Sequence, residues 1–124
     1  MGDFKHFSWK EFDCKSGKGK AIDNMDKEFI CLLDDARGIA GVPFKITSGY
    51  RTPEYNIALL EQGYKGSKNS SHTKGLAADI YTKDSFTRFK IVTALMIVGI
   101  NRIGIGNNFV HCDIDEDKSQ QVLW

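Results

Sequence analysis

Three side chains that could share one metal ion lie in two short segments of the sequence. His72 and Asp79 are seven positions apart in the segment NSSHTKGLAADIYTKDS, and His111 lies in the segment FVHCDI. Two imidazoles and one carboxylate form a three-ligand set for zinc that leaves a fourth position for water. Small residues between the first two ligands, Gly75 and Ala77 among them, leave room for another group to approach. The pattern therefore predicts a metal site, provided that the fold brings the two segments together.

The individual residues have other interpretations. A single histidine in a strand, such as His111, is more often a hydrogen-bonded structural residue than a metal ligand. A carboxylate within the apolar run GLAADIY is costly to bury without a partner or a metal, which favours a ligand role for Asp79. The ligand types favour zinc, although two histidines and one aspartate can also bind other divalent ions.

Apolar spacing and alternation predict the elements that must position these residues. The N-caps expected for the three helices are Asp23, Thr52 before Pro53, and Asp84 or Ser85. Residues 63–71 are polar and glycine-rich and indicate a loop. The expected elements are a helix over 22–40, a strand over 44–47, a helix over 53–63, a strand over 75–81, a helix over 86–98 and strands over 102–106 and 109–114.

Alternation along the expected strands places the candidate ligands on one face. In 75–81, Asp79 points away from the side that carries Ala78 and Ile80. In 109–114, His111 and Asp113 share a face, while the alternate residues face the core. A small sheet in which these strands lie side by side would bring the ligands together.

Length and composition fit one small globular domain. The chain has 124 residues, of which 41% are apolar and 27% charged, which is enough for a single modest core. We expect one α+β domain over 1–124, with an antiparallel sheet, helices packed against one face, and the tail 122–124 docked back on it. Cys14 is expected to be an exposed thiol, whereas Cys31 and Cys112 lie among apolar residues and are expected in the core.

The charge balance and hydropathy exclude several functional classes. Lys plus Arg number 17 and Asp plus Glu 16, so there is no basic excess of the kind that nucleic-acid binding requires. The longest apolar run, 94–98, is much shorter than the roughly 20 residues that span a bilayer. The N-terminal segment lacks the apolar region of a secretory signal. We therefore expect no membrane insertion and synthesis in the cytoplasm.

Three motifs together resemble the signature of the M15 zinc peptidases. These are SGYR, SSHTKGLAAD and FVHCD, and the resemblance extends over nearly the whole chain. The family comprises D-Ala-D-Ala carboxypeptidases and peptidoglycan endopeptidases and shares its fold with the hedgehog signalling domain. The resemblance implies a Zn²⁺ ion held by His72, Asp79 and His111.

The resemblance also implies roles around the metal. It places Arg51 in the cleft, where a guanidinium suits a substrate carboxylate; the alternative is a salt bridge that anchors the helix from Pro53. Ser70 would hydrogen-bond near the substrate or cap the loop before His72. Tyr50 would line the cleft or pack structurally.

The general base is the point at which the sequence departs from the family. In several relatives a Glu or Asp lies three positions before the last histidine, and here that position is Asn108, which cannot take a proton. The nearest candidate is Asp113. It could act as the base, or it could orient a ligand imidazole by accepting a hydrogen bond from it. Asp115 and Glu116 are weaker candidates, expected in a solvated turn.

The resemblance implies zinc-dependent hydrolysis of an amide bond in a peptidoglycan stem peptide. Whether the hydrolysed bond is terminal or internal stays open at this point. The short chain suggests a monomeric lytic enzyme of phage or bacterial type. Such an enzyme would act at the cell wall or in the periplasm, with virion association as a further option. Two alternatives remain. One is a zinc-binding module without catalysis that binds a partner, and the other is a structural component that binds stem peptides through Arg51.

Overall fold

The computed structural model describes residues 2–124. It contains three-residue-per-turn (3-10) helices, labelled η, as well as α-helices and strands. In chain order the elements are η1 (Trp9–Phe12), α1 (Ala21–Asn24), α2 (Lys27–Ala40), β1 (Ile46–Ser48), α3 (Pro53–Glu61), η2 (Ser71–Lys74), β2 (Ala77–Tyr81), α4 (Ser85–Ile97), β3 (Arg102–Ile105), β4 (Phe109–Asp113) and β5 (Val122–Leu123).

The five strands form one sheet in the order β1-β2-β4-β3-β5. The first three pairings are antiparallel, and the tail adds β5 parallel to β3. The α+β class and the docked tail are confirmed, whereas the sheet is mixed because its last pair is parallel. The central pairing sets Asp79 of β2 opposite His111 of β4. His111 is also opposite Gly104 of β3, a residue without a side chain to crowd it.

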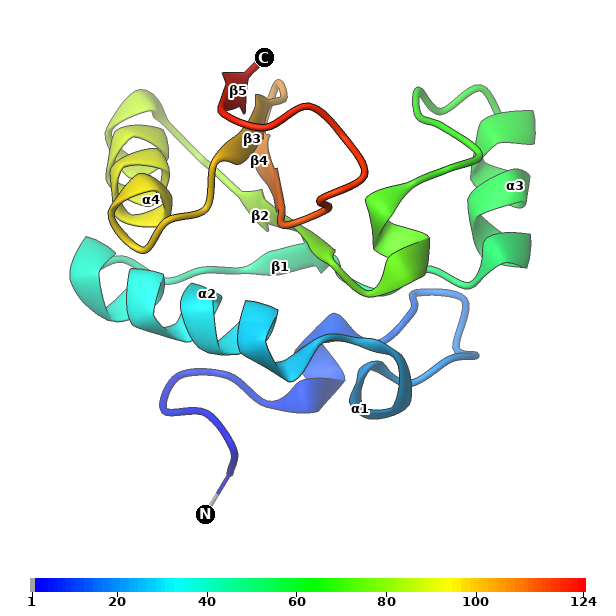
Figure 1. Cartoon of the computed structure of the whole chain (residues 1–124), viewed down its shortest axis with the longest axis horizontal. Helices are drawn as coiled ribbons and strands as arrows, with labels where there is room; N and C mark the ends of the chain where they lie inside the picture. The colour runs from blue at the N-terminus through cyan, green and yellow to red at the C-terminus, as the bar shows by residue number, and fades with distance from the viewer. Residues whose placement is uncertain (1) are drawn as a thin grey trace.

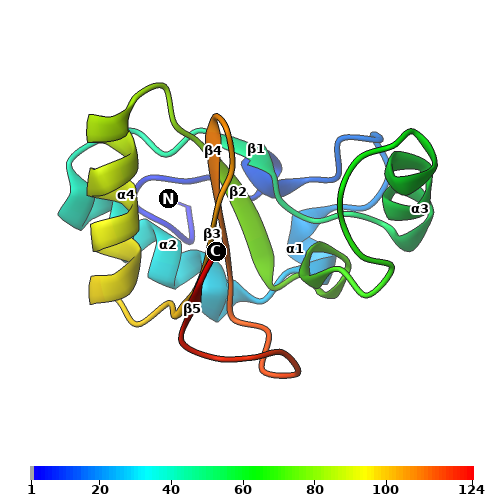
Figure 2. The same cartoon turned by 90° about the horizontal axis from the view of Figure 1, so that it is seen from above.

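Helices α2 and α4 lie side by side and cover one face of the sheet, as Figures 1 and 2 show. Helix α3 lies at the opposite end of the molecule, with η2 between it and the sheet. The buried core between α2, α4 and the sheet includes Phe29, Ile30, Leu33, Ile80, Ile91, Leu95, Ile103 and Val110. The other side of β2 and β4 therefore remains available for a site.

The first predicted helix is interrupted. The chain forms the short α1, passes through Met25 in an extended conformation, and starts α2 at Lys27. The cap is therefore Asp26 rather than Asp23, because the Asp26 carboxylate accepts hydrogen bonds from the amides of Glu28 and Phe29. The interruption joins this segment to the region of η2, because the Asp26 amide donates a hydrogen bond to the Gly75 carbonyl beside that helix.

The other two caps are as predicted. Thr52 accepts a hydrogen bond from the Tyr55 amide ahead of Pro53, and Asp84, rather than Ser85, accepts from the Thr87 amide. The prediction of an exposed Cys14 is wrong. Its backbone amide is bonded to the Gly19 carbonyl and the residue is buried.

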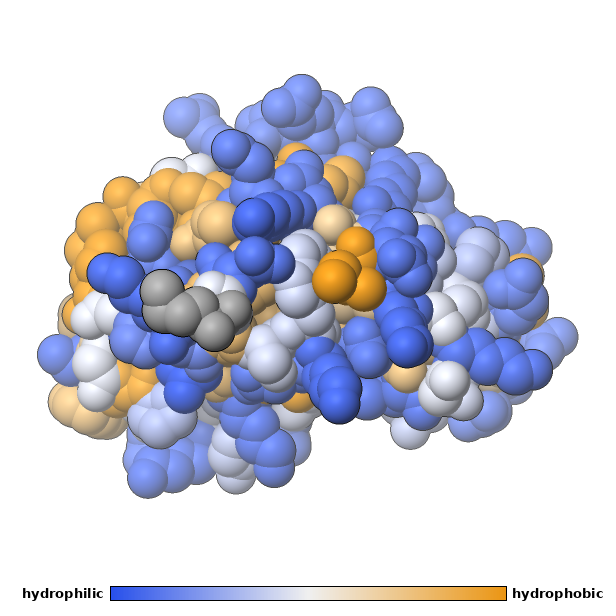
Figure 3. All heavy atoms as spheres, turned by 90° about the horizontal axis from the view of Figure 1, so that it is seen from below, coloured by the Kyte–Doolittle hydropathy of each residue, from blue (hydrophilic) through white to orange (hydrophobic). Residues whose placement is uncertain are grey.

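The surface is mostly hydrophilic on the face seen from below, and hydrophobic residues gather along its left side, where α2 and α4 lie (Figure 3). The large exposed apolar side chains of α4 are Phe86, Phe89, Met96 and Ile97. None of the helices in residues 2–124 has the length and apolar character needed to cross a membrane.

Candidate metal centre

Strand pairing brings two of the three predicted ligands together. Asp79 and His111 are directly opposed across β2 and β4, and side chains of opposed residues point to the same face of a sheet. The Nδ1 atom of His111 lies 2.9 Å from Oδ1 of Asp79. The third predicted ligand, His72, lies outside this pairing, on a separate element.

Helix η2 carries the third predicted ligand, His72. Ser70 caps this short helix by accepting a hydrogen bond from the His72 amide, and Gly75 ends it in the left-handed conformation, with φ of 73°. A Cβ atom at Gly75 would overlap the carbonyl oxygen of Asn24. Only glycine therefore combines this turn with such a close backbone approach.

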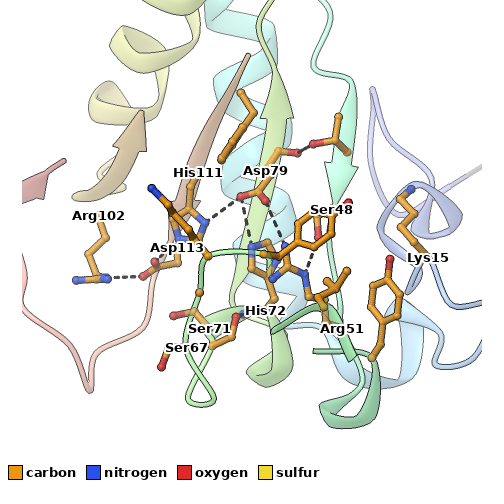
Figure 4. Close-up of a pocket in the computed structure, with 18 of the residues that line it drawn as sticks. Lys15, Ser48, Arg51, Ser67, Ser71, His72, Asp79, Arg102, His111 and Asp113 are labelled. Carbon is orange, nitrogen blue, oxygen red and sulfur yellow. Dashed lines mark hydrogen bonds and ion pairs between the residues drawn. The ribbon is translucent and has the colours of Figure 1, made fainter. Parts of the chain in front are cut away.

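A hydrogen bond fixes the orientation of the His72 ring. Its Nδ1 atom lies 2.8 Å from the Gly49 carbonyl oxygen. A carbonyl can only accept, so Nδ1 carries the proton and Nε2 presents its lone pair. Nε2 points at Asp79, 3.3 Å from Oδ1. Figure 4 shows His72 and His111 on either side of Asp79.

The three residues form a compact donor set. One ligand atom from each of His72, Asp79 and His111 can be chosen so that all three lie within 4.8 Å of one another. Burial opposes ionisation of Asp79, but its contacts with the imidazoles of His111 and His72 hold the pKa of its carboxyl well below its usual range. The ionised carboxylate and two imidazole nitrogens are donors that zinc prefers, so the residues fit a zinc ion.

Asp113 contacts Nε2 of His111, the ring nitrogen that does not face Asp79. Its Oδ2 atom lies 2.7 Å from Nε2 of His111, and its Oδ1 atom accepts from Nε of Arg102 at 2.6 Å and from the Asp115 amide at 3.1 Å. The residue is 0% exposed. Burial lowers the pKa of His111, but its hydrogen bonds to Asp113 and Asp79 raise it more. Both Asp113 oxygens are thus engaged within the protein.

The residues predicted around the metal have different positions. Arg51 lies in the cleft, where its Nε donates to Ser48 Oγ at 3.0 Å and its Nη2 is 3.6 Å from Oδ2 of Asp79. It does not form the alternative salt bridge to the helix from Pro53. Ser70 caps η2 and also lines the cleft. Tyr50 instead packs in the core, where burial raises the pKa of its hydroxyl.

The expectation of a solvated turn at Asp115 is wrong. This residue is only 1% exposed, because its carboxylate turns inward and accepts hydrogen bonds from Ser71 and Lys74. Asn108 lies at the turn between β3 and β4, where its carbonyl accepts from the Thr82 amide. Asn108 is not among the residues that line the cleft.

The three predicted ligands line a cleft of about 500 Å³. Sequence reasoning missed several of its lining residues. The basic ones are Lys15, Lys65, Arg102 and Lys118, in addition to Arg51, and the aromatic ones include Tyr55, Tyr64 and Trp124. The acidic side chains that line the cleft in residues 2–124 are Asp79 and Asp113, both already engaged. The cleft is therefore strongly basic.

Trp124 forms one wall of the cleft. Its ring lies 5.6 Å from that of His111 and under the guanidinium of Arg102 at 5.0 Å. A Cβ at Gly104 would come within 2.7 Å of the indole. Glycine within a strand can indicate such a close approach, so Gly104 in RIGIG is the signal from which this wall could have been predicted.

Within residues 2–124, His72, Asp79 and His111 form a donor set that could hold a metal ion beside a basic cleft, an arrangement that metal-dependent hydrolases use. Comparison with known families agrees with this class. The model of the family described as peptidase M15 matches residues 5–113. The chain therefore belongs to the peptidase M15 family.

A solved structure shares the fold. The crystal structure of the Serratia marcescens L-Ala D-Glu endopeptidase ChiX aligns with a TM-score of 0.63, covering 77% of this chain and 84% of that chain at 16% identity. The hedgehog-like α+β fold expected for the family is thereby confirmed. A search among curated proteins found no match.

Proposed function

We propose that this protein is a zinc-dependent peptidase that hydrolyses an amide bond in the stem peptides of bacterial peptidoglycan. The observation that carries the proposal is the His72–Asp79–His111 donor set at the base of a basic cleft. Membership of the M15 family and the fold shared with an endopeptidase support the proposal.

His72 through Nε2, His111 through Nδ1 and Asp79 through its carboxylate are the atoms proposed to hold the ion. When bound, zinc would lower the pKa of a water ligand to about 7 and polarise the scissile carbonyl. The other ring nitrogen of each histidine forms a hydrogen bond within the protein: Nδ1 of His72 with the Gly49 carbonyl, and Nε2 of His111 with Asp113. Such partners fix the tautomer and the ring orientation of metal ligands.

Four cations favour an internal bond in an acidic peptide. Lys15, Arg51, Lys65 and Lys118 come from separate segments and line the same cleft. A single terminal carboxylate would need one such partner, and a stem peptide with carboxylates on both sides of the scissile bond could engage several. We therefore propose endopeptidase rather than carboxypeptidase activity, with Arg51 and Ser70 nearest the reacting bond. The enzyme would act at the cell wall, as a phage-type or bacterial lytic protein.

We assign Asp113 to support of His111 rather than to proton transfer. Both of its oxygens already accept hydrogen bonds, and bonds from His111 and Arg102 lower its pKa despite burial. This assignment leaves no carboxylate in the described part of the cleft as an evident base. That observation favours, as a second candidate function, a zinc-binding module that binds an acidic peptide without cleaving it.

Digestion of purified peptidoglycan tests the proposal. We expect zinc-loaded protein to release new amino groups, and mass analysis of the products to locate the cut inside the stem. The Asp79→Asn variant, which removes a ligand while preserving side-chain volume, is the matched control. Zinc binding without release would support the binding module. Retention on stem peptides without zinc would support a structural component that binds through Arg51.

A further inference from the structure

A buried carboxylate outside the donor set connects the two segments that carry the histidine ligands. Asp115 follows β4, two residues beyond Asp113, and its backbone amide donates to Oδ1 of Asp113 at 3.1 Å. Its own Oδ2 accepts from Oγ of Ser71 at 2.8 Å. Ser71 is the first residue of η2 and immediately precedes His72.

These contacts form a continuous path of hydrogen bonds between the ligands. It runs from Nε2 of His111 to Asp113, from Asp113 to the Asp115 amide, and from the Asp115 carboxylate to Ser71. Figure 4 shows Asp113 beside His111, and Ser71 beside His72. The path is independent of the direct contacts of the histidines with Asp79.

Asp115 has the partners that a buried charge requires. It is 1% exposed, and an ionised carboxylate is costly to bury unless it is paired and hydrogen-bonded. Nζ of Lys74, the last residue of η2, donates to both of its oxygens at 3.1 and 3.0 Å. Lys118 approaches Oδ2 at 3.7 Å. Asp115 thus holds both ends of η2, through Ser71 at the first residue and Lys74 at the last.

Helix η2 is too short to be held in place by its own hydrogen bonds, so contacts with the rest of the protein must fix its position. It has only four residues, and 3-10 helices have poorer hydrogen-bond geometry than α-helices. The β2–β4 pairing fixes Asp79 and His111, but His72 reaches the centre from this short helix alone. A displacement of η2 would move Nε2 of His72 away from the other two donors.

We propose that Asp115 is a positioning residue of the metal centre, which sets the distance between the two histidine ligands by holding η2 against the end of β4. The inference rests on the proposed metal centre. It does not require that the protein cleave peptidoglycan. Partners of metal ligands typically contribute about 10- to 100-fold to metal affinity. Because Asp115 acts through Asp113 and Ser71, we expect a value near the lower limit, about tenfold.

The test is zinc affinity, measured by competition with a chromophoric chelator at a temperature where every variant is folded. We expect Asp115→Asn to weaken zinc binding about tenfold. Asp117→Asn is the matched control, because Asp117 also pairs with Lys74, at 3.3 Å, but its side chain is 81% exposed. The control should bind zinc like the wild type. Ser71→Ala removes the bond to η2 without unpairing Lys74, and should also weaken zinc binding if Asp115→Asn does not fold.

The outcomes separate this inference from the proposed function. If the wild type binds no zinc, the proposed metal centre fails. If the wild type binds zinc and both Asp115→Asn and Ser71→Ala bind it equally well, Asp115 is not a positioning residue, whatever it contributes to stability. A lower melting temperature with unchanged zinc affinity would likewise overturn the inference. Equally weakened binding in Asp117→Asn would overturn it too, because it would indicate a general effect of charge.

Discussion

Replacement of Asp113 by asparagine distinguishes the two roles that this residue could have. Asparagine has nearly the same volume and can still accept a hydrogen bond from Nε2 of His111, but it cannot take a proton from a water molecule. Asp113 accepts the 2.7 Å bond from His111 and the 2.6 Å bond from Arg102 while it is 0% exposed. The substitution therefore changes charge at a site where solvent cannot compensate.

The two roles predict different magnitudes. Loss of a partner of a metal ligand typically weakens metal binding by about 10- to 100-fold, or about 1.4 to 2.7 kcal/mol. Because the amide oxygen still accepts from His111, we expect about tenfold. Loss of a general base lowers the rate by about 10²- to 10⁴-fold. If Asp113 supports His111, the turnover rate at saturating zinc should stay within about tenfold of the wild type.

The assay measures zinc affinity by chelator competition and turnover on purified peptidoglycan over a range of zinc concentrations. We expect the Asp113→Asn defect to be largely recovered by added zinc. Zinc affinity equal to that of the wild type, together with turnover that is slower by about 10²-fold or more, would refute the assignment and make Asp113 the base. A zinc-loaded melting temperature measured alongside excludes simple unfolding as the cause.

Three other perturbations test the site and its supports. Arg51→Met should raise KM for stem peptides by about 10-fold or more with a smaller change in kcat, because a charge-assisted contact to substrate is lost. Steady-state kinetics on defined peptides measures both constants, and an unchanged KM would contradict the prediction. Asn108→Asp, which restores an acid where relatives have one, should leave turnover unchanged because Asn108 does not line the cleft, and a tenfold gain would show that it reaches the reacting water. The third perturbation is a change of pH. Burial opposes ionisation of Asp115, but hydrogen bonds from Lys74 and Ser71 lower its pKa. The stability that the Asp115 carboxylate adds is therefore present above its unfolded pKa of about 3.9 and is lost as the pH falls through its lower folded pKa. The difference in free energy of unfolding between the wild type and Asp115→Asn, from urea titrations, should therefore be constant from about pH 5 to 7 and shrink below about pH 4, and a difference that grows on acidification would contradict the sign.

Much of the site could be predicted because its strands and helix caps depend on residues that are close together in the sequence. Alternation in GLAADIY and FVHCDI places Asp79, His111 and Asp113 on one strand face, and the structure pairs these strands in the register that opposes Asp79 and His111. Thr52 before Pro53 and Asp84 are caps whose partners lie within three residues. Short-range patterns of this kind are present in the sequence itself.

The features that were missed depend on distant contacts. Asp115 was expected in a solvated turn, and it is buried because Ser71 and Lys74, more than 40 positions earlier, supply its partners. The interruption before α2 arises from the bond between the Asp26 amide and the Gly75 carbonyl. No periodicity in the sequence encodes such pairs. Tyr50 directly precedes Arg51, yet the two side chains point to different environments, which a resemblance between motifs does not reveal.

The most direct test of the central claim combines the zinc content of the purified protein with amine release from purified peptidoglycan, with and without chelator. We predict one zinc per chain, bound by the wild type and lost in His72→Ala and His111→Ala. We also predict release that stops with chelator and returns with zinc, from a cut inside the stem. Failure of the folded protein to bind zinc would contradict the metal centre. One zinc per chain with no release under any condition would contradict the peptidase and leave the binding module.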